Sequence, residues 1–141
     1  QRIRDTLQSG RAAERFARMV AAQGGPRDFL TRWRDQLPGA PVVRDVPALA
    51  AGVISRIDTR AVGEAVVHLG GGRLRNGDAV DPRVGFSDLR GLGMGVGPGV
   101  PLARVHAATE DSANRAIAAV QAAYTLGEKP DVPPLVQGRV A

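Results

Sequence analysis

The chain has 141 residues, of which 43% are hydrophobic and 4% aromatic, and its formal net charge at pH 7 is +5. This length and apolar content suffice for one hydrophobic core, which the small aromatic share restricts to alanine, valine, leucine and isoleucine. Because the chain has no cysteine, disulfide bonds, thiolate metal sites and a cysteine nucleophile are excluded.

The positive charge comes from nineteen basic residues, of which only Lys129 is lysine. The arginines are scattered among acids and no aromatic residues form a base-stacking platform, so the sequence does not favour a nucleic-acid partner. No apolar run approaches the roughly 18 residues of a membrane span, and the N-terminus lacks a signal-peptide pattern. We therefore expect no membrane partner and a cytoplasmic location. The start at Gln1 suggests a piece of a longer polypeptide.

Two helices are expected in the N-terminal part. Residues 1–8 carry alternating charge and are interpreted as the end of an earlier element. Ser9 is the expected N-cap of the first helix, which ends at the glycines of positions 24 and 25. A second, shorter helix follows Pro26, and Trp33 on its apolar face is expected to anchor a core.

Residues 38–51 contain three prolines and no sustained helical pattern, which indicates a domain junction with a short strand at residues 42–43. Residues 52–57 alternate as a strand does, and Asp58 or Thr59 is placed to cap the helix that follows.

Residues 62–78 form the most distinctive stretch. Its first half predicts a helix that ends at three glycines, Gly70, Gly71 and Gly72, followed by Arg73 and Arg75 on a loop that Asn-Gly-Asp turns back. Two interpretations fit: a helix C-cap with a solvated turn, or an arginine-tipped flap that closes over an anion. A P-loop is excluded because the glycines follow a helix and no lysine is near.

Beyond this loop, residues 80–107 favour short strands broken by glycines, the last strand alternating over residues 102–107. Thr109 is the expected N-cap of the final helix, whose apolar stripe runs from Ala113 to Tyr124. After Gly127 the prolines predict an extended tail.

No catalytic constellation is expected within the chain. His68 suits a helix end and His106 ends a strand, so both are given structural roles, and neither has metal-ligand spacing. The serines of Ser87-Asp88 and Asp111-Ser112 are interpreted as turn and cap residues. The glycine pattern of residues 93–105 resembles half of a biotinyl or lipoyl domain, but the only lysine lies in the tail and does not support a carrier function.

Five segments together resemble the C-terminal third of the thymidine phosphorylases, in the pyrimidine-nucleoside phosphorylase family. They are residues 12–26, 57–63, 69–73, 84–88 (Val-Gly-Phe-Ser-Asp) and 101–107 (Pro-Leu-Ala-Arg-Val-His-Ala), in order across nearly the whole chain. The resemblance implies a homodimeric salvage enzyme that cleaves thymidine with phosphate as co-substrate and without a cofactor. The family's phosphate- and base-binding residues lie in the first half of the full enzyme. None maps here, so no catalytic residue and no metal site are assigned to this chain, which is expected to be inactive alone.

The resemblance also implies a fold and an arrangement of segments. We expect an α/β (α+β) fold, in which residues 1–40 are a helical segment from the parent α/β domain. Residues 41–127 form an α/β-hammerhead-type C-terminal domain with short antiparallel strands, and residues 128–141 are an extended tail.

In some family members the loop at residues 70–73 orders as the active-site cleft closes. The candidate site residues are therefore Gly70, Gly71, Gly72, Arg73 and Arg75. The expected role is that of scaffold and cleft closure, with the rest of the enzyme chain as partner. The alternative is a stand-alone α/β-hammerhead binding module without catalysis.

Overall fold

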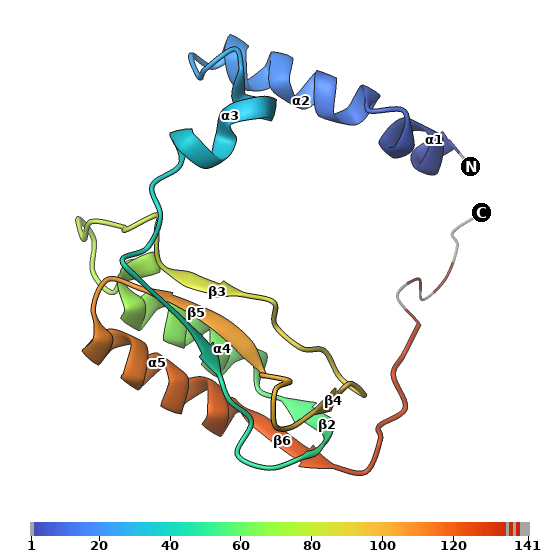
Figure 1. Cartoon of the computed structure of the whole chain (residues 1–141), viewed down its shortest axis with the longest axis vertical. Coiled ribbons are helices and arrows are strands. Elements are labelled where there is room, and N and C mark those ends of the chain that lie inside the picture. Colours follow the sequence, from blue (N-terminus) through green and yellow to red (C-terminus); the bar gives the residue numbers. More distant parts are fainter. Residues whose placement is uncertain (1, 135, 137, 139–141) are drawn as a thin grey trace. The chain divides into compact units, whose positions relative to one another are not determined.

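The computed structural model describes residues 2–134, 136 and 138, and the chain forms two compact units, Gln1–Pro38 and Gly39–Ala141. The first unit is helical. The second combines two helices with short antiparallel strands, which confirms the predicted α/β (α+β) class (Figure 1).

The first unit contains three helices, where the sequence predicted two: α1 (Arg2–Gln8), α2 (Arg11–Ala22) and α3 (Phe29–Gln36). The expected N-cap at Ser9 is wrong, because Gly10 occupies that position with a φ of 75°. The Ser9 hydroxyl instead donates to the Thr6 carbonyl of α1.

The expectation that Trp33 anchors a core is also wrong for this unit. Trp33 is 40% exposed, and the Arg34 guanidinium lies 4.4 Å from its ring centroid. None of residues 2–38 is buried, because three short helices offer too little surface to enclose a core. The nearest approach to one is an edge-on contact of Phe16 with Phe29, whose ring centroids are 5.9 Å apart.

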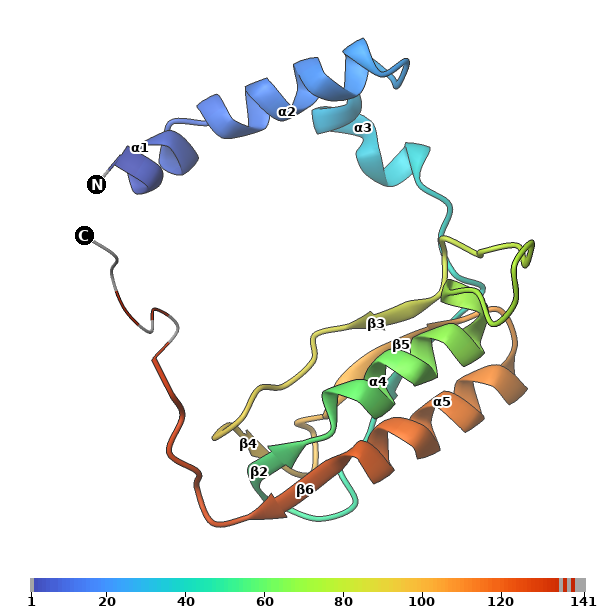
Figure 2. The same ribbon diagram turned by 180° about the vertical axis from the view of Figure 1, so that it is seen from behind.

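The second unit holds two three-stranded antiparallel sheets. One has the order β1-β5-β3, from β1 (Val42–Val46), β5 (Ala103–Ala107) and β3 (Gly85–Ser87). The other has the order β4-β2-β6, from β4 (Gly95–Val96), β2 (Gly52–Ile57) and β6 (Tyr124–Gly127). The helices α4 (Thr59–Val66) and α5 (Glu110–Ala123) run side by side, and α5 packs against β1 and β5 (Figure 2).

The core of the second unit lies between these helices and the strands. Its largest fully buried side chains are Ile54, Val46, Val105 and Val120. In β5 the residues alternate between buried and more exposed positions, with Val105 buried and Arg104 exposed, as the sequence predicted. Apart from Tyr124, the buried residues of this core are aliphatic, in agreement with the small aromatic share of the sequence.

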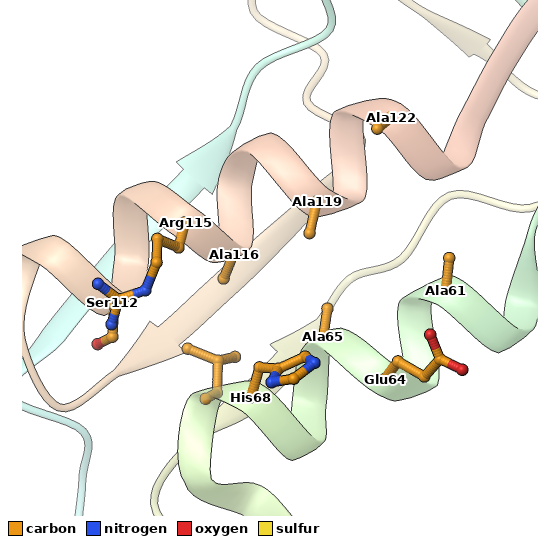
Figure 3. Close-up of a pocket in the computed structure, with 10 residues that line it drawn as sticks. Ala61, Glu64, Ala65, His68, Ser112, Arg115, Ala116, Ala119 and Ala122 are labelled. Carbon is orange, nitrogen blue, oxygen red and sulfur yellow. The ribbon is translucent and has the colours of Figure 1, made fainter.

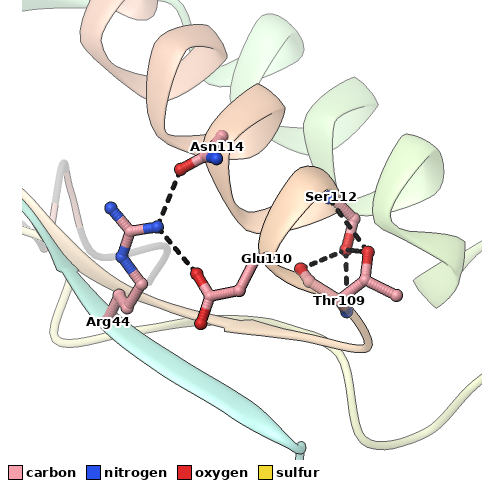
Figure 4. Close-up of polar contacts among 5 residues, drawn as sticks. All are labelled: Arg44, Thr109, Glu110, Ser112 and Asn114. Carbon is pink, nitrogen blue, oxygen red and sulfur yellow. Dashed lines mark hydrogen bonds and ion pairs between the residues drawn. The ribbon is translucent and has the colours of Figure 1, made fainter.

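The start of α5 confirms the predicted cap. The Thr109 hydroxyl accepts a hydrogen bond from the Ser112 amide, and the Ser112 hydroxyl accepts one from the Thr109 amide (Figure 4). The same end of α5 is tied to β1, because Arg44 donates to both Glu110 and Asn114.

Two strands differ from the sequence prediction. The strand expected at residues 42–43 extends to Val46, since all five residues pair with β5. The expected helical position of Tyr124 is wrong, because Tyr124 begins β6 and pairs with Ile57 of β2. Its hydroxyl donates to the Arg90 carbonyl at 3.0 Å, and burial raises the pKa of Tyr124.

Candidate functional site

The glycine-arginine loop begins where α4 widens into a π-helical turn. Asp58 caps α4 by accepting a hydrogen bond from the Ala61 amide, which settles the predicted choice between Asp58 and Thr59. After Val66 the helix continues as η1 (Val67–Gly71), and the positive φ of Gly70 ends the helical backbone at the glycine run, where the sequence predicted the helix end. Such π-turns are frequent at functional sites.

At each of the three glycine positions there is a steric reason for glycine. Gly70 has a φ of 99°, a conformation that suits glycine at a helix end. A Cβ on Gly71 would lie 2.8 Å from Val66 Cγ1, and one on Gly72 would lie 2.8 Å from Val67 Cγ2. The run therefore allows the chain to pass close to its own helix as it leaves η1.

The loop itself is closed by Asp78. One oxygen of its carboxylate accepts the amides of Leu74 at 3.1 Å and Arg75 at 2.8 Å. Its backbone carbonyl accepts a hydrogen bond from Arg73 Nε at 3.2 Å. The turn at Gly77, with a φ of 94°, brings Asp78 back to these donors. The loop is thus a small folded unit held by its own hydrogen bonds.

Both loop arginines are exposed. Within the described part of the chain, no hydrogen bond uses the two Nη atoms of Arg73 or the guanidinium of Arg75. The structure therefore leaves these groups able to bind an anion from outside the loop.

The base of the loop is fastened by Asp81, which the sequence analysis missed. The Asp81 amide donates to the Gly70 carbonyl at 2.9 Å. Its carboxylate accepts Nε and Nη2 of Arg83, each at 2.8 Å, and the Arg83 amide at 3.0 Å. These bonds lower the pKa of Asp81 to about 2. The Asp-Pro-Arg order is the signal that indicates such a turn, since an Asp side chain readily bonds the amide two residues on.

A groove of about 500 Å³ runs between α4 and α5 (Figure 3). Alanines of both helices, Ala65 and Ala116 among them, line it, and Glu64, His68 and Arg115 add polar groups. Arg115 is already paired with Asp111 of its own helix. The small side chains reflect the close approach of the two helices.

The sheet β1-β5-β3 carries one further polar cluster. The Ser87 hydroxyl lies 2.9 Å from His106 Nε2, and the Asp88 carboxylate accepts a hydrogen bond from Ser87. Asp88 thus contacts the serine and not the imidazole, so it does not orient the histidine as a catalytic triad requires. The interpretation of Ser87 as a turn residue is wrong, since it ends strand β3.

Among the residues that the structure describes, no group of three or more His, Asp or Glu side chains is placed to hold a metal ion. Every described helix is too short or too polar to cross a bilayer.

Comparison with known proteins places this fold in a family. Residues 53–127, which contain the loop and both sheets except β1 and the first residue of β2, match the model of the pyrimidine nucleoside phosphorylase C-terminal domain. The chain belongs to this family of enzyme domains.

The relatives it matches carry a more specific name. Thymidine phosphorylase of Burkholderia cenocepacia strain HI2424 is 48% identical over 140 residues, which is 99% of this chain and 32% of the relative. Thymidine phosphorylase of Colwellia psychrerythraea strain 34H is 46% identical over 137 residues, or 96% of this chain and 31% of the relative. The chain thus spans about a third of the length of these curated relatives.

Proposed function

We propose that this chain is the C-terminal part of a thymidine phosphorylase, which cleaves thymidine with phosphate to thymine and 2-deoxyribose 1-phosphate. The observation that carries the proposal is the 48% identity to a thymidine phosphorylase over 99% of the chain. The parent enzyme is proposed to be a cytoplasmic homodimer that uses phosphate as co-substrate and needs no cofactor.

Within that enzyme, we propose that the chain serves as a scaffold and takes part in the closure of the active-site cleft. About two thirds of the relatives' length lies outside the match, and we place the catalytic groups there. The Ser87–His106 pair is the nearest approach to a catalytic pair among the described residues. Its neighbouring acid, Asp88, accepts a hydrogen bond from the serine and does not contact the histidine.

We propose that the glycine-arginine loop, residues 70–78, makes the contact across the cleft when the cleft closes. Its two arginines present guanidinium groups with free donors on a folded loop, which suits an anion such as phosphate or a carboxylate across the cleft.

Two measurements test these proposals. The 141-residue chain alone should release no thymine from thymidine and phosphate, whereas the full-length polypeptide should do so. In the full-length enzyme, Arg73→Ala removes a charged hydrogen-bond donor and should lower kcat/KM about tenfold. Arg56→Ala is the matched control, because Arg56 is an exposed arginine on β2. Thymine release by the chain alone would refute the scaffold role, and equal kinetics of the two variants would refute the role of the loop.

A further inference from the structure

Asp78 is the residue whose hydrogen bonds hold the glycine-arginine loop together. Its carboxylate oxygen Oδ2 accepts two successive amides, those of Leu74 and Arg75, and its carbonyl accepts Arg73 Nε. Its own amide donates to the Arg75 carbonyl at 3.2 Å, which closes the same ring of contacts from the other side. Four hydrogen bonds thus join one residue to the three-residue segment that carries both arginines.

The hydrophobic core does not account for this arrangement. None of residues 72–80 is buried, and Leu74, between the two arginines, is 67% exposed. The loop is also fastened to η1 without Asp78, through the Asp81 amide and the Gly70 carbonyl. The Asp78 contacts therefore act within the loop tip, where they fix the backbone from which the arginines project.

The pattern of donors and acceptors keeps the arginines usable. The Asp78 carboxylate is bound by backbone amides, so its charge does not hold a guanidinium. Among the described residues, Arg73 is held through Nε by the Asp78 carbonyl, which restrains its side chain and leaves its two Nη groups for another acceptor. A side chain held in its binding orientation loses less entropy when it binds.

We infer that Asp78 is a positioning residue, which sets the loop arginines for the anion they contact when the cleft closes; this inference rests on the proposed function of the loop. The contact is made by the arginines, and Asp78 acts through them.

The test uses the full-length enzyme. It compares the kinetics of three variants, Asp78→Ala, Asp78→Asn and Asp131→Ala, with those of the Arg73→Ala variant. Asp78→Ala removes the acceptor of both amides and should lower kcat/KM for phosphate about tenfold, while the KM for thymidine stays within about twofold. Asp78→Asn should restore most of the activity, because both amides bind one oxygen and an amide oxygen can accept both. Asp131→Ala, at an exposed acid in the described part of the tail, is the matched control and should be unchanged.

Non-additivity separates positioning from a general structural effect. If Asp78 acts through Arg73, the double variant Asp78→Ala with Arg73→Ala should be no worse than the more damaging single variant by more than about twofold. Fully additive losses, or an Asp78→Asn variant as damaged as Asp78→Ala, would overturn the inference.

The kinetics of these variants also separate a failure of this inference from a failure of the proposed function of the loop. Kinetics of Arg73→Ala equal to those of the Arg56→Ala control would remove the role of the loop altogether. A clear loss in Arg73→Ala together with unchanged kinetics in Asp78→Ala would remove only the role of Asp78.

Discussion

At the scale of single residues, the glycines of α4 and η1 have different reasons to be glycine. Gly71 has Val66 Cγ1, the Val66 carbonyl oxygen and Val84 Cγ2 around the position where a Cβ would be. Gly63, in the middle of α4, has no heavy atom within 4 Å of that position. One glycine is required by its neighbours and the other is not.

We therefore expect opposite effects from the same substitution. Gly71→Ala should destabilise the chain by about 1–3 kcal/mol, because the stiff Val66 side chain and the backbone must shift to admit a methyl group. Gly63→Ala should stabilise it by about 0.5–1 kcal/mol, because alanine favours the helix over glycine. The free energy of unfolding from urea titration, followed by circular dichroism, measures both. A Gly71→Ala chain at least as stable as the unsubstituted one would contradict the close approach of η1 to α4.

At the scale of elements, α5 depends on a cap that is local in sequence. Thr109→Ala removes the hydroxyl that accepts the Ser112 amide and should cost about 1 kcal/mol of stability. Thr109→Ser keeps the hydroxyl and should lose much less. Thermal unfolding of the two variants beside the unsubstituted chain gives the comparison. Equal losses in both would mean that the hydroxyl does not hold the helix end.

The same locality explains which elements the sequence predicted. Caps are chosen by residues within four positions of one another, so Thr109 was identified correctly and Asp58 was one of the two candidates for the cap of α4. Alternation likewise gave β2 and β5. Strand β6 was missed because Tyr124 continues the helical stripe of α5, and only its pairing with Ile57, far away in sequence, makes it a strand.

The sequence indicated where the candidate loop lies, but it did not predict the hydrogen bonds that hold the loop together. The glycine run and the arginines marked the loop, whereas Asn-Gly-Asp indicated only a turn. Which amides Asp78 accepts depends on the positive φ of Gly77, and the join from Asp81 to Gly70 depends on the π-turn of η1. Whether the five predicted residues contact a ligand stays a prediction.

At the scale of the whole molecule, the two units differ in what holds them together. The second unit encloses the buried core of the chain, from Val46 to Tyr124. In the first, α1, α2 and α3 have 7, 12 and 8 residues, and none of them buries a side chain. Helices shorter than about 12–15 residues are marginal in water without such burial.

We therefore expect the second unit to carry the cooperative unfolding of the chain. Removal of residues 1–38 should leave the midpoint of thermal unfolding unchanged, and a peptide of residues 1–38 should show little helix by circular dichroism. Trp33, the only tryptophan of the chain, should already emit as a solvent-exposed indole before the chain unfolds, because this residue is 40% exposed. A truncated chain that melts at a clearly lower temperature would contradict the expectation that the second unit unfolds independently of residues 1–38.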